Sequence, residues 1–204
     1  IGADVAEMGF NLMVTEGAKH VLGWKSPNYM YANNINPKLR LLLRNYRLSD
    51  DISLRFASDC LTTDNYVERL NDIKDGEVVN VCVDYDNFGY KYDDSTGILN
   101  FMRYLPEAIF NNTDFEFAKP IEMLDKLQTM SMFDAPIPLS CMDEERDLSA
   151  WMGNVLQDDA LETLYSFANK VKRNKEEDVI RDWNALQDAN HFYSLCTKYS
   201  NVSP

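Results

Sequence analysis

The stretch Val78-Val79-Asn80-Val81-Cys82-Val83-Asp84 decides the fold expected of this chain. Its first six residues are β-branched or apolar with one exception, which is typical of a strand buried on both faces of a parallel sheet. An acid, Asp84, follows the run directly. Upstream, residues 10–14 form a second short apolar run, and the acid Glu16 closes it. The sequence therefore predicts two buried strands, each followed by a carboxylate.

Strand and helix signals alternate on both sides of this stretch. A loop rich in aromatic residues, Asn and Pro is expected over residues 23–36. The predicted strands are residues 10–14, 52–56, 78–83 and, weakly, 115–117; the predicted helices are residues 37–43, 62–73, 95–109 and 120–127. Such alternation implies an α/β fold whose parallel strands are joined by right-handed crossovers. About four strands are too few to close a parallel barrel.

The pattern changes after Met130. A stretch with two prolines and several acids is followed by two long helical patterns, residues 154–173 and 176–199. We therefore expect two parts, residues 1–130 with the strands and the two acids, and residues 131–204 as a helical extension.

Composition narrows the possible partners. The 204 residues are 45% hydrophobic, and 33 acidic against 20 basic side chains give a formal charge of −13. This charge argues against nucleic acid and anionic membranes as partners, because both need clustered positive charge. No apolar run reaches the ~18 residues of a membrane span. Neutral ligands such as sugars remain possible partners.

The four cysteines are widely and irregularly spaced, so a zinc site is not expected. A reduced, cytoplasmic protein is the simplest interpretation, although an even number of cysteines leaves disulfides open. The chain starts at Ile1, and its first residues look like the tail of a helix. We therefore expect that an N-terminal portion precedes it.

Glu16 and Asp84 carry the functional hypothesis. The carboxyl ends of parallel strands meet at one edge, so acids that follow two buried strands can lie close together. Paired carboxylates in different environments are the working groups of glycoside hydrolysis. The alternative is that each acid caps a helix or forms a turn. The nearby aromatic residues Trp24, Tyr85 and Phe88 could stack on sugars or complete the core.

Several strings resemble the catalytic domain of glycoside hydrolase family 57, in the right order along nearly the whole chain. They correspond to a later portion of that domain. The strings are Val14-Thr15-Glu16-Gly17, Val21-Leu22-Gly23-Trp24-Lys25-Ser26-Pro27-Asn28-Tyr29, Leu42 to Ile52, Val79 to Gly89, Ala150-Trp151-Met152-Gly153-Asn154, and the segment from Trp183 through His191 to Lys198.

This resemblance implies part of an incomplete (β/α)7 barrel with a helical extension packed near the cleft. It also implies α-amylase-like, retaining hydrolysis of α-glucans, with Glu16 as nucleophile and Asp84 as general acid/base, and with no metal or cofactor. The expected substrate-binding residues are Trp24, Tyr85, Phe88, Trp151, Trp183, Gln187 and His191. Gln187 and His191 would continue the helical face of Trp183 toward the cleft.

Two further functions stay open at this point. The first is a 4-α-glucanotransferase, which uses the same chemistry with a sugar acceptor. The second is a catalytically weak glucan-binding relative. It is favoured by one departure, since Tyr90-Lys91 stands where the family usually has Glu-His.

Overall fold

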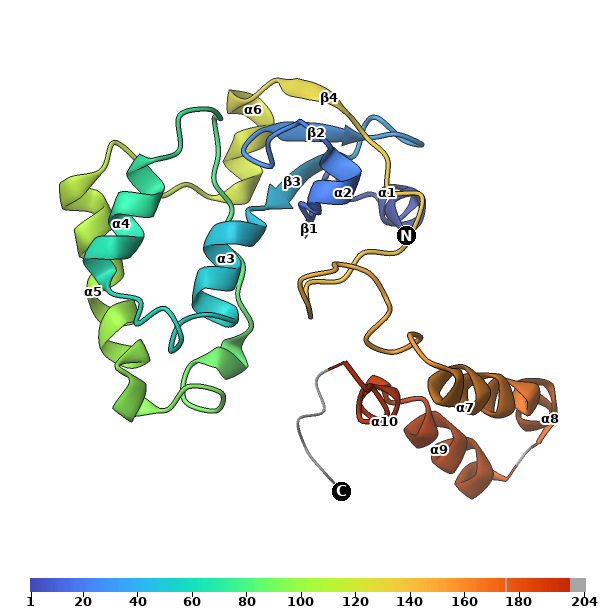
Figure 1. Ribbon diagram of the computed structural model, residues 1–204. Coiled ribbons are helices and arrows are strands. Elements are labelled where there is room, and N and C mark those ends of the chain that lie inside the picture. The colour runs from blue at the N-terminus through green and yellow to red at the C-terminus, as the bar shows by residue number, and fades with distance from the viewer. Residues whose placement is uncertain (175, 199–204) are drawn as a thin grey trace. The chain divides into compact units, whose positions relative to one another are not determined.

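The computed structural model describes residues 1–174 and 176–198 (Figure 1). The chain divides into two compact units, residues 1–136 and residues 137–204.

Unit 1 is built on a mixed, mostly parallel sheet of four strands. The strands are β1 (Leu12–Glu16), β2 (Met30–Asn33), β3 (Arg40–Arg44) and β4 (Thr129–Phe133), in the spatial order β1-β3-β2-β4. β1 is parallel to β3 and β4 is parallel to β2, whereas β2 is antiparallel to β3. The predicted α/β class is confirmed, and the expectation of parallel strands is wrong at β2. The sheet does not test the (β/α)7 barrel, which stays a prediction.

The central strand β3 was predicted as a helix. Its three leucines, Leu41 to Leu43, are each at most 2% exposed, so β3 is buried on both faces. A short buried run of this kind has no alternating pattern and cannot be distinguished from a helix by its periodicity. β2 likewise lies inside the predicted loop, where Met30, Tyr31 and Ala32 are buried.

Residues 78–83, predicted as the central strand, are extended but form no strand in the structure. Their backbone pairs with the sheet at a parallel bridge between Asn80 and Arg44, supported by a 2.7 Å hydrogen bond from the Asn45 N–H to the Asn80 carbonyl. The neighbouring position along β3 is taken by β2, and Val81 is 38% exposed. Residues 52–56 were also wrongly predicted as a strand, since they lie at the end of a helix and in the turn after it, and residues 115–117 form none.

Helices pack beside the sheet in unit 1 (Figure 1). They are α1 (Gly2–Glu7), α2 (Lys19–Leu22), α3 (Tyr46–Ser53), α4 (Thr63–Asn71), α5 (Ile98–Asn112) and α6 (Met123–Lys126), with short 3-10 turns at Tyr85–Asn87, Asp94–Thr96 and Pro120–Glu122. The predicted helices at residues 62–73, 95–109 and 120–127 are confirmed, and α5 continues through Pro106. Aromatic rings of Phe56, Tyr66 and Phe101 pack edge to face in the core between α3, α4 and α5.

Unit 2 contains α7 (Val155–Ser166), α8 (Ala168–Arg173), α9 (Glu177–Leu186) and α10 (Ala189–Tyr193). The two predicted long helices are therefore each divided. α9 ends at Leu186, and Asp188 caps α10 by accepting a hydrogen bond from the Asn190 N–H. The predicted helix end at residue 199 lies outside the described residues. Among the helices that the structure describes, none is long and apolar enough to cross a bilayer.

The buried side chain of Gln157 joins the parts of unit 2. Its Oε1 accepts from the Gly153 N–H at 2.9 Å. Its Nε2 donates to the Ala150 carbonyl at 2.8 Å and to the Phe192 carbonyl of α10 at 2.9 Å. These bonds hold the start of α7 against α10, and the Gln157 side chain that makes them is fully buried.

Candidate active site

Glu16 is the last residue of β1 and lies in register with Arg44, the last residue of β3. Arg44 Nη1 contacts Glu16 Oε2 at 3.1 Å, and Arg44 Nη2 contacts Asp50 Oδ1 of α3 at 2.8 Å. The three side chains are at most 6% exposed. A buried carboxylate requires such compensation, because transferring an unpaired charge out of water costs several kcal/mol. Glu16 therefore belongs to a buried ion-pair cluster at the carboxyl ends of β1 and β3.

Two local features of the sequence shape this edge. A Cβ atom at Gly17 would lie 2.4 Å from the Arg44 carbonyl oxygen, so only glycine allows the chain after β1 to lie this close to β3. On β3, Asn45 ends the strand and starts α3, because its side chain accepts a hydrogen bond from the Leu48 N–H at 3.1 Å. The cap directs α3 so that Asp50 reaches Arg44.

The segment that carries Asp84 is attached to the same arginine. Arg44 Nε donates to the Cys82 carbonyl at 2.8 Å, and the Cys82 N–H donates to Ser49 Oγ at 3.1 Å. Asp84 itself is exposed, and its carbonyl accepts hydrogen bonds from the backbone and side chain of Asn87. One guanidinium thus contacts Glu16 directly and the backbone two residues before Asp84. Arg44 therefore links Glu16 to the segment that leads to Asp84.

Lys91 adds a second positive charge near this edge. Its Nζ donates to the Ser53 carbonyl at 2.5 Å and lies 5.5 Å from the centre of the Tyr92 ring. Burial lowers the pKa of Lys91, while the negative charges of Asp84 and Asp50 act in the opposite direction. Lys91 thus interacts electrostatically with Asp84 and with Asp50.

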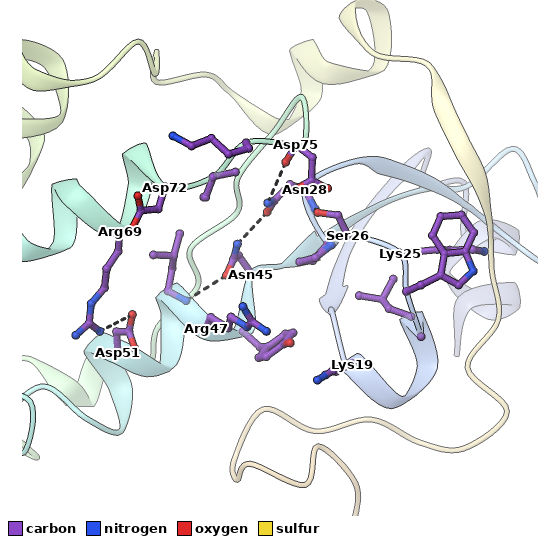
Figure 2. Close-up of a pocket in the computed structure, with 18 of the residues that line it drawn as sticks. Lys19, Lys25, Ser26, Asn28, Asn45, Arg47, Asp51, Arg69, Asp72 and Asp75 are labelled. Carbon is purple, nitrogen blue, oxygen red and sulfur yellow. Dashed lines mark hydrogen bonds and ion pairs between the residues drawn. The ribbon is translucent and has the colours of Figure 1, made fainter.

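A hollow of about 680 Å³ lies next to the same edge (Figure 2). Its wall includes Asn45 and Tyr46, directly after Arg44, and the exposed Trp24. Within it, Asn45 donates to Asn28, which in turn donates to the Asp75 carbonyl. The volume falls within the ~300–1,000 Å³ range of ligand pockets. Glu16 and Asp84 are not among its lining residues.

A second hollow of about 650 Å³ in unit 1 has a mainly apolar wall. Residues 77–81 and Val83 line it together with α5 and the chain before α6. Because this apolar run forms part of the wall of the second hollow, residues 78–83 are only partly buried.

The predicted substrate-binding residues of unit 1 have different environments. Trp24 is 86% exposed and Tyr85 is 89% exposed, so both rings are accessible. Phe88 is partly buried and packs against the core between α3, α4 and α5. The alternative of core packing therefore fits Phe88 better than sugar stacking.

In unit 2 the predicted polar stripe is not one helical face. Trp183 and Gln187 belong to α9 and its end, whereas His191 is exposed on α10, beyond the break. The ring of Trp183 packs edge to face on Tyr165 at 6.2 Å, and Gln187 Nε2 donates to the Trp183 carbonyl. The ring of Trp151 packs against Tyr193 at 6.1 Å. Trp151 and Trp183 thus make contacts within their own unit.

The sequence did not identify Arg44 or Asp50, and it marked Lys91 only as a departure from the family pattern. Arg44 had one available signal, because a charged residue that directly follows a run of leucines must be either exposed or paired. Its pairing depends on the strand register, which composition does not give. Asp50 lies on α3, a helix that the sequence did not predict, so the direction of its side chain could not be inferred.

One acidic group could hold a cation. Ligand oxygens of Asp143, Glu145 and Asp147 lie within 4.8 Å of one another. Lys198 Nζ contacts both Glu145 and Ser149. Its ammonium group therefore already supplies a positive charge beside these acids.

The structure thus defines an α/β protein whose strands β1 and β3 end at a buried cluster of Glu16, Arg44 and Asp50. The family model of glycosyl hydrolase family 57 matches residues 2–138. Because this match covers more than half of the chain, the chain belongs to glycosyl hydrolase family 57.

One curated relative is a protein of Methanocaldococcus jannaschii named "Putative alpha-amylase". It is 36% identical over 202 residues, which is 92% of this chain and 43% of the relative. The chain thus spans less than half the length of that relative. No solved structure matches the chain significantly.

Proposed function

We propose that this protein is a retaining, α-amylase-like glycoside hydrolase that acts on α-glucans, with Glu16 as nucleophile and Asp84 as general acid/base. The observation that carries the proposal is the double attachment of Arg44, to the Glu16 carboxylate at 3.1 Å and to the Cys82 carbonyl at 2.8 Å. Family membership and the hollow lined by Trp24 at the same edge support it.

In the first step, the protonated carboxyl of Asp84 donates its proton to the glycosidic oxygen as the bond from that oxygen to the anomeric carbon breaks. The Glu16 carboxylate attacks the same carbon and forms a glycosyl ester. Arg44 holds the Glu16 carboxylate in place for the attack, whereas Asp84 is exposed and open to solvent.

In the second step, the Asp84 carboxylate takes a proton from water as the water oxygen attacks the anomeric carbon. The ester bond breaks, Glu16 returns as a carboxylate, and Asp84 is again protonated. Two inversions leave the sugar with its original configuration. Retention calls for carboxyl groups ~5–5.5 Å apart in the catalytic state.

The remaining parts of the proposal concern substrate and architecture. We assign Trp24 and Tyr85 to glucan stacking, and keep Trp151, Trp183, Gln187 and His191 as substrate-binding candidates contributed by the helical residues 131–204. Phe88 is assigned to the core. We further propose that residues 1–130 form part of an incomplete (β/α)7 barrel and that the protein acts in the cytoplasm.

A 4-α-glucanotransferase would use the same residues, with a sugar hydroxyl in place of water. The presence of Lys91 where the family usually has His favours a second alternative, a weakly catalytic glucan-binding protein, because Lys91 adds a charge near Asp84. Product analysis separates these functions. A hydrolase releases reducing ends from maltoheptaose, a transferase gives longer and shorter glucans with no net gain of reducing ends, and a binding protein retains starch without products.

The test compares Glu16→Gln and Asp84→Asn with the control Asp86→Asn, an exposed acid two positions beyond Asp84. Each site variant should lower kcat on soluble starch by at least ~10³-fold, with starch still retained in affinity electrophoresis. Asp86→Asn should stay within ~3-fold of the wild type. A Glu16→Gln or Asp84→Asn protein that keeps more than about a tenth of the activity would contradict the assignment.

A further inference from the structure

The guanidinium of Arg44 joins three segments that are distant in the sequence. Nη1 contacts Glu16 at the end of β1, Nη2 contacts Asp50 on α3, and Nε donates to the carbonyl of Cys82. These distances are 3.1, 2.8 and 2.8 Å, and the Arg44 side chain is only 6% exposed. Arginine suits this role because its planar fork presents donors in fixed directions. Lysine has the charge but lacks this geometry.

We propose that Arg44 is a positioning residue that holds the Glu16 carboxylate and the Asp84 segment in one frame, and that Asp50 sets how much of its positive charge acts on Glu16. This inference rests on the proposed function, because it assigns roles relative to the two acids. Arg44 itself does not touch the reacting atoms.

The register of the sheet explains why Arg44 reaches Glu16. Paired residues of neighbouring parallel strands point to the same face, and Glu16 is paired with Arg44. Asn80 bridges to the other side of Arg44, which brings the chain toward Cys82. The side chain of Asn80 also donates to the Leu43 carbonyl at 3.1 Å. Arg44 is thus the point at which β1 and the Asp84 segment meet β3.

The charges around Arg44 give Asp50 a distinct role. Glu16 and Asp50 share one guanidinium, and Lys91 supplies a further positive charge that acts on Asp50 and on Asp84. Replacing Asp50 by asparagine removes the competing anion and keeps a similar shape. The full Arg44 charge then acts on Glu16 and favours its ionised form. Replacing Arg44 has the opposite effect, because Glu16 becomes a buried anion beside Asp50.

These opposite effects define the first experiment, the pH profile of kcat/KM on soluble starch. In Asp50→Asn the acid limb of this profile should move to lower pH by about 1 pH unit. In Arg44→Lys the charge remains but is less well directed, so the acid limb should move to higher pH by about the same amount. Arg44→Lys should also lower kcat about 10²-fold, the effect of a ~1 Å misplacement of a reacting group.

Asp51→Asn is the matched control. Asp51 is the adjacent buried acid on α3, but it forms ion pairs with Arg55 and Arg69, at 2.7 and 2.8 Å. This variant should lose stability without moving the acid limb. Equal shifts in Asp50→Asn and Asp51→Asn, or shifts of the same sign in Asp50→Asn and Arg44→Lys, would overturn the inference.

Amide hydrogen exchange provides a readout that does not depend on activity. Arg44→Lys should raise exchange in residues 82–88 at least about tenfold, because the bond to the Cys82 carbonyl is weakened, whereas Asp51→Asn should not. Unchanged exchange in Arg44→Lys would contradict the positioning role. If the wild-type protein does not turn over starch, the proposed function fails, and the exchange data still decide whether Arg44 holds this segment.

Discussion

Replacing Arg44 by methionine should destabilise unit 1 severely. The substitution preserves much of the apolar volume but leaves Glu16 and Asp50 buried, with side-chain exposures of 4% and 2%. Breaking a buried ion pair by removing one partner costs about 3–5 kcal/mol. We therefore expect a loss of about 4 kcal/mol in the free energy of unfolding, a large share of the ~5–15 kcal/mol available to a typical domain.

Urea unfolding followed by circular dichroism measures this loss. With a slope of ~2 kcal/mol per molar urea, the midpoint should fall by about 2 M. Arg55→Met is the matched control, because Arg55 pairs with Asp51 but is 32% exposed. Its loss should be at most about 1 kcal/mol. The double variant Arg44→Met/Asp50→Asn should be more stable than Arg44→Met alone, since one buried charge is removed.

Two results would refute this reasoning. An Arg44→Met protein no less stable than Arg55→Met would mean that the Glu16 and Asp50 carboxylates are hydrated. A strictly additive double-variant cycle would mean that Arg44 and Asp50 do not interact, whereas contacting pairs usually couple by about 0.5–3 kcal/mol.

Three further predictions concern other parts of the chain. Gln157→Leu should cost about 3 kcal/mol in urea unfolding, because the buried carbonyls of Ala150 and Phe192 and the partly buried N–H of Gly153 lose their partners, and a loss below about 1 kcal/mol would mean that these two carbonyls are hydrated. Trp24→Ala should raise KM for starch about tenfold and change stability by less than ~0.5 kcal/mol, since the ring is 86% exposed; an unchanged KM would remove Trp24 from the site. Burial, followed by the charges of Tyr29 and Asp75, raises the pKa of Tyr31 to about 12. Because the folded-state pKa of Tyr31 lies above the unfolded value of ~10, the free energy of unfolding should be retained below about pH 10 and decline toward pH 12. Ultraviolet titration should show the late ionisation of Tyr31 in the wild type and lack it in Tyr31→Phe.

The sequence predicted those elements whose pattern is local. Residues 62–73 and 95–109 have helical spacing and form α4 and α5. The strand before Glu16 was also predicted, because turn signals bound a short apolar run, and it forms β1.

The failures have a common physical cause. Residues 78–83 have strong strand propensity, yet a strand needs a neighbouring chain with which to pair, and β2 occupies that position along β3. The buried run of β3 could equally have been a helix until its neighbours were known. Propensity is thus overridden by tertiary contacts.

The site was predictable only in part. Glu16 was singled out because an acid that closes a short apolar run is a local signal, although β1 is only partly buried and Val14 is 46% exposed. Arg44 was missed because its role arises from the pairing of β1 with β3 and from the approach of Cys82. Gln187 and His191 were joined on one helical face because the break before Asp188 was not recognised.

The most direct test of the central claim is to identify the residue that carries the glycosyl ester. The protein is incubated with 5-fluoro-α-glucosyl fluoride, which slows hydrolysis of the ester, and its peptides are analysed by mass spectrometry. The account predicts one glucosyl adduct, on the peptide that contains Glu16, and its absence in Glu16→Gln. An adduct on any other carboxylate, or turnover of starch with inversion of the sugar, would contradict it.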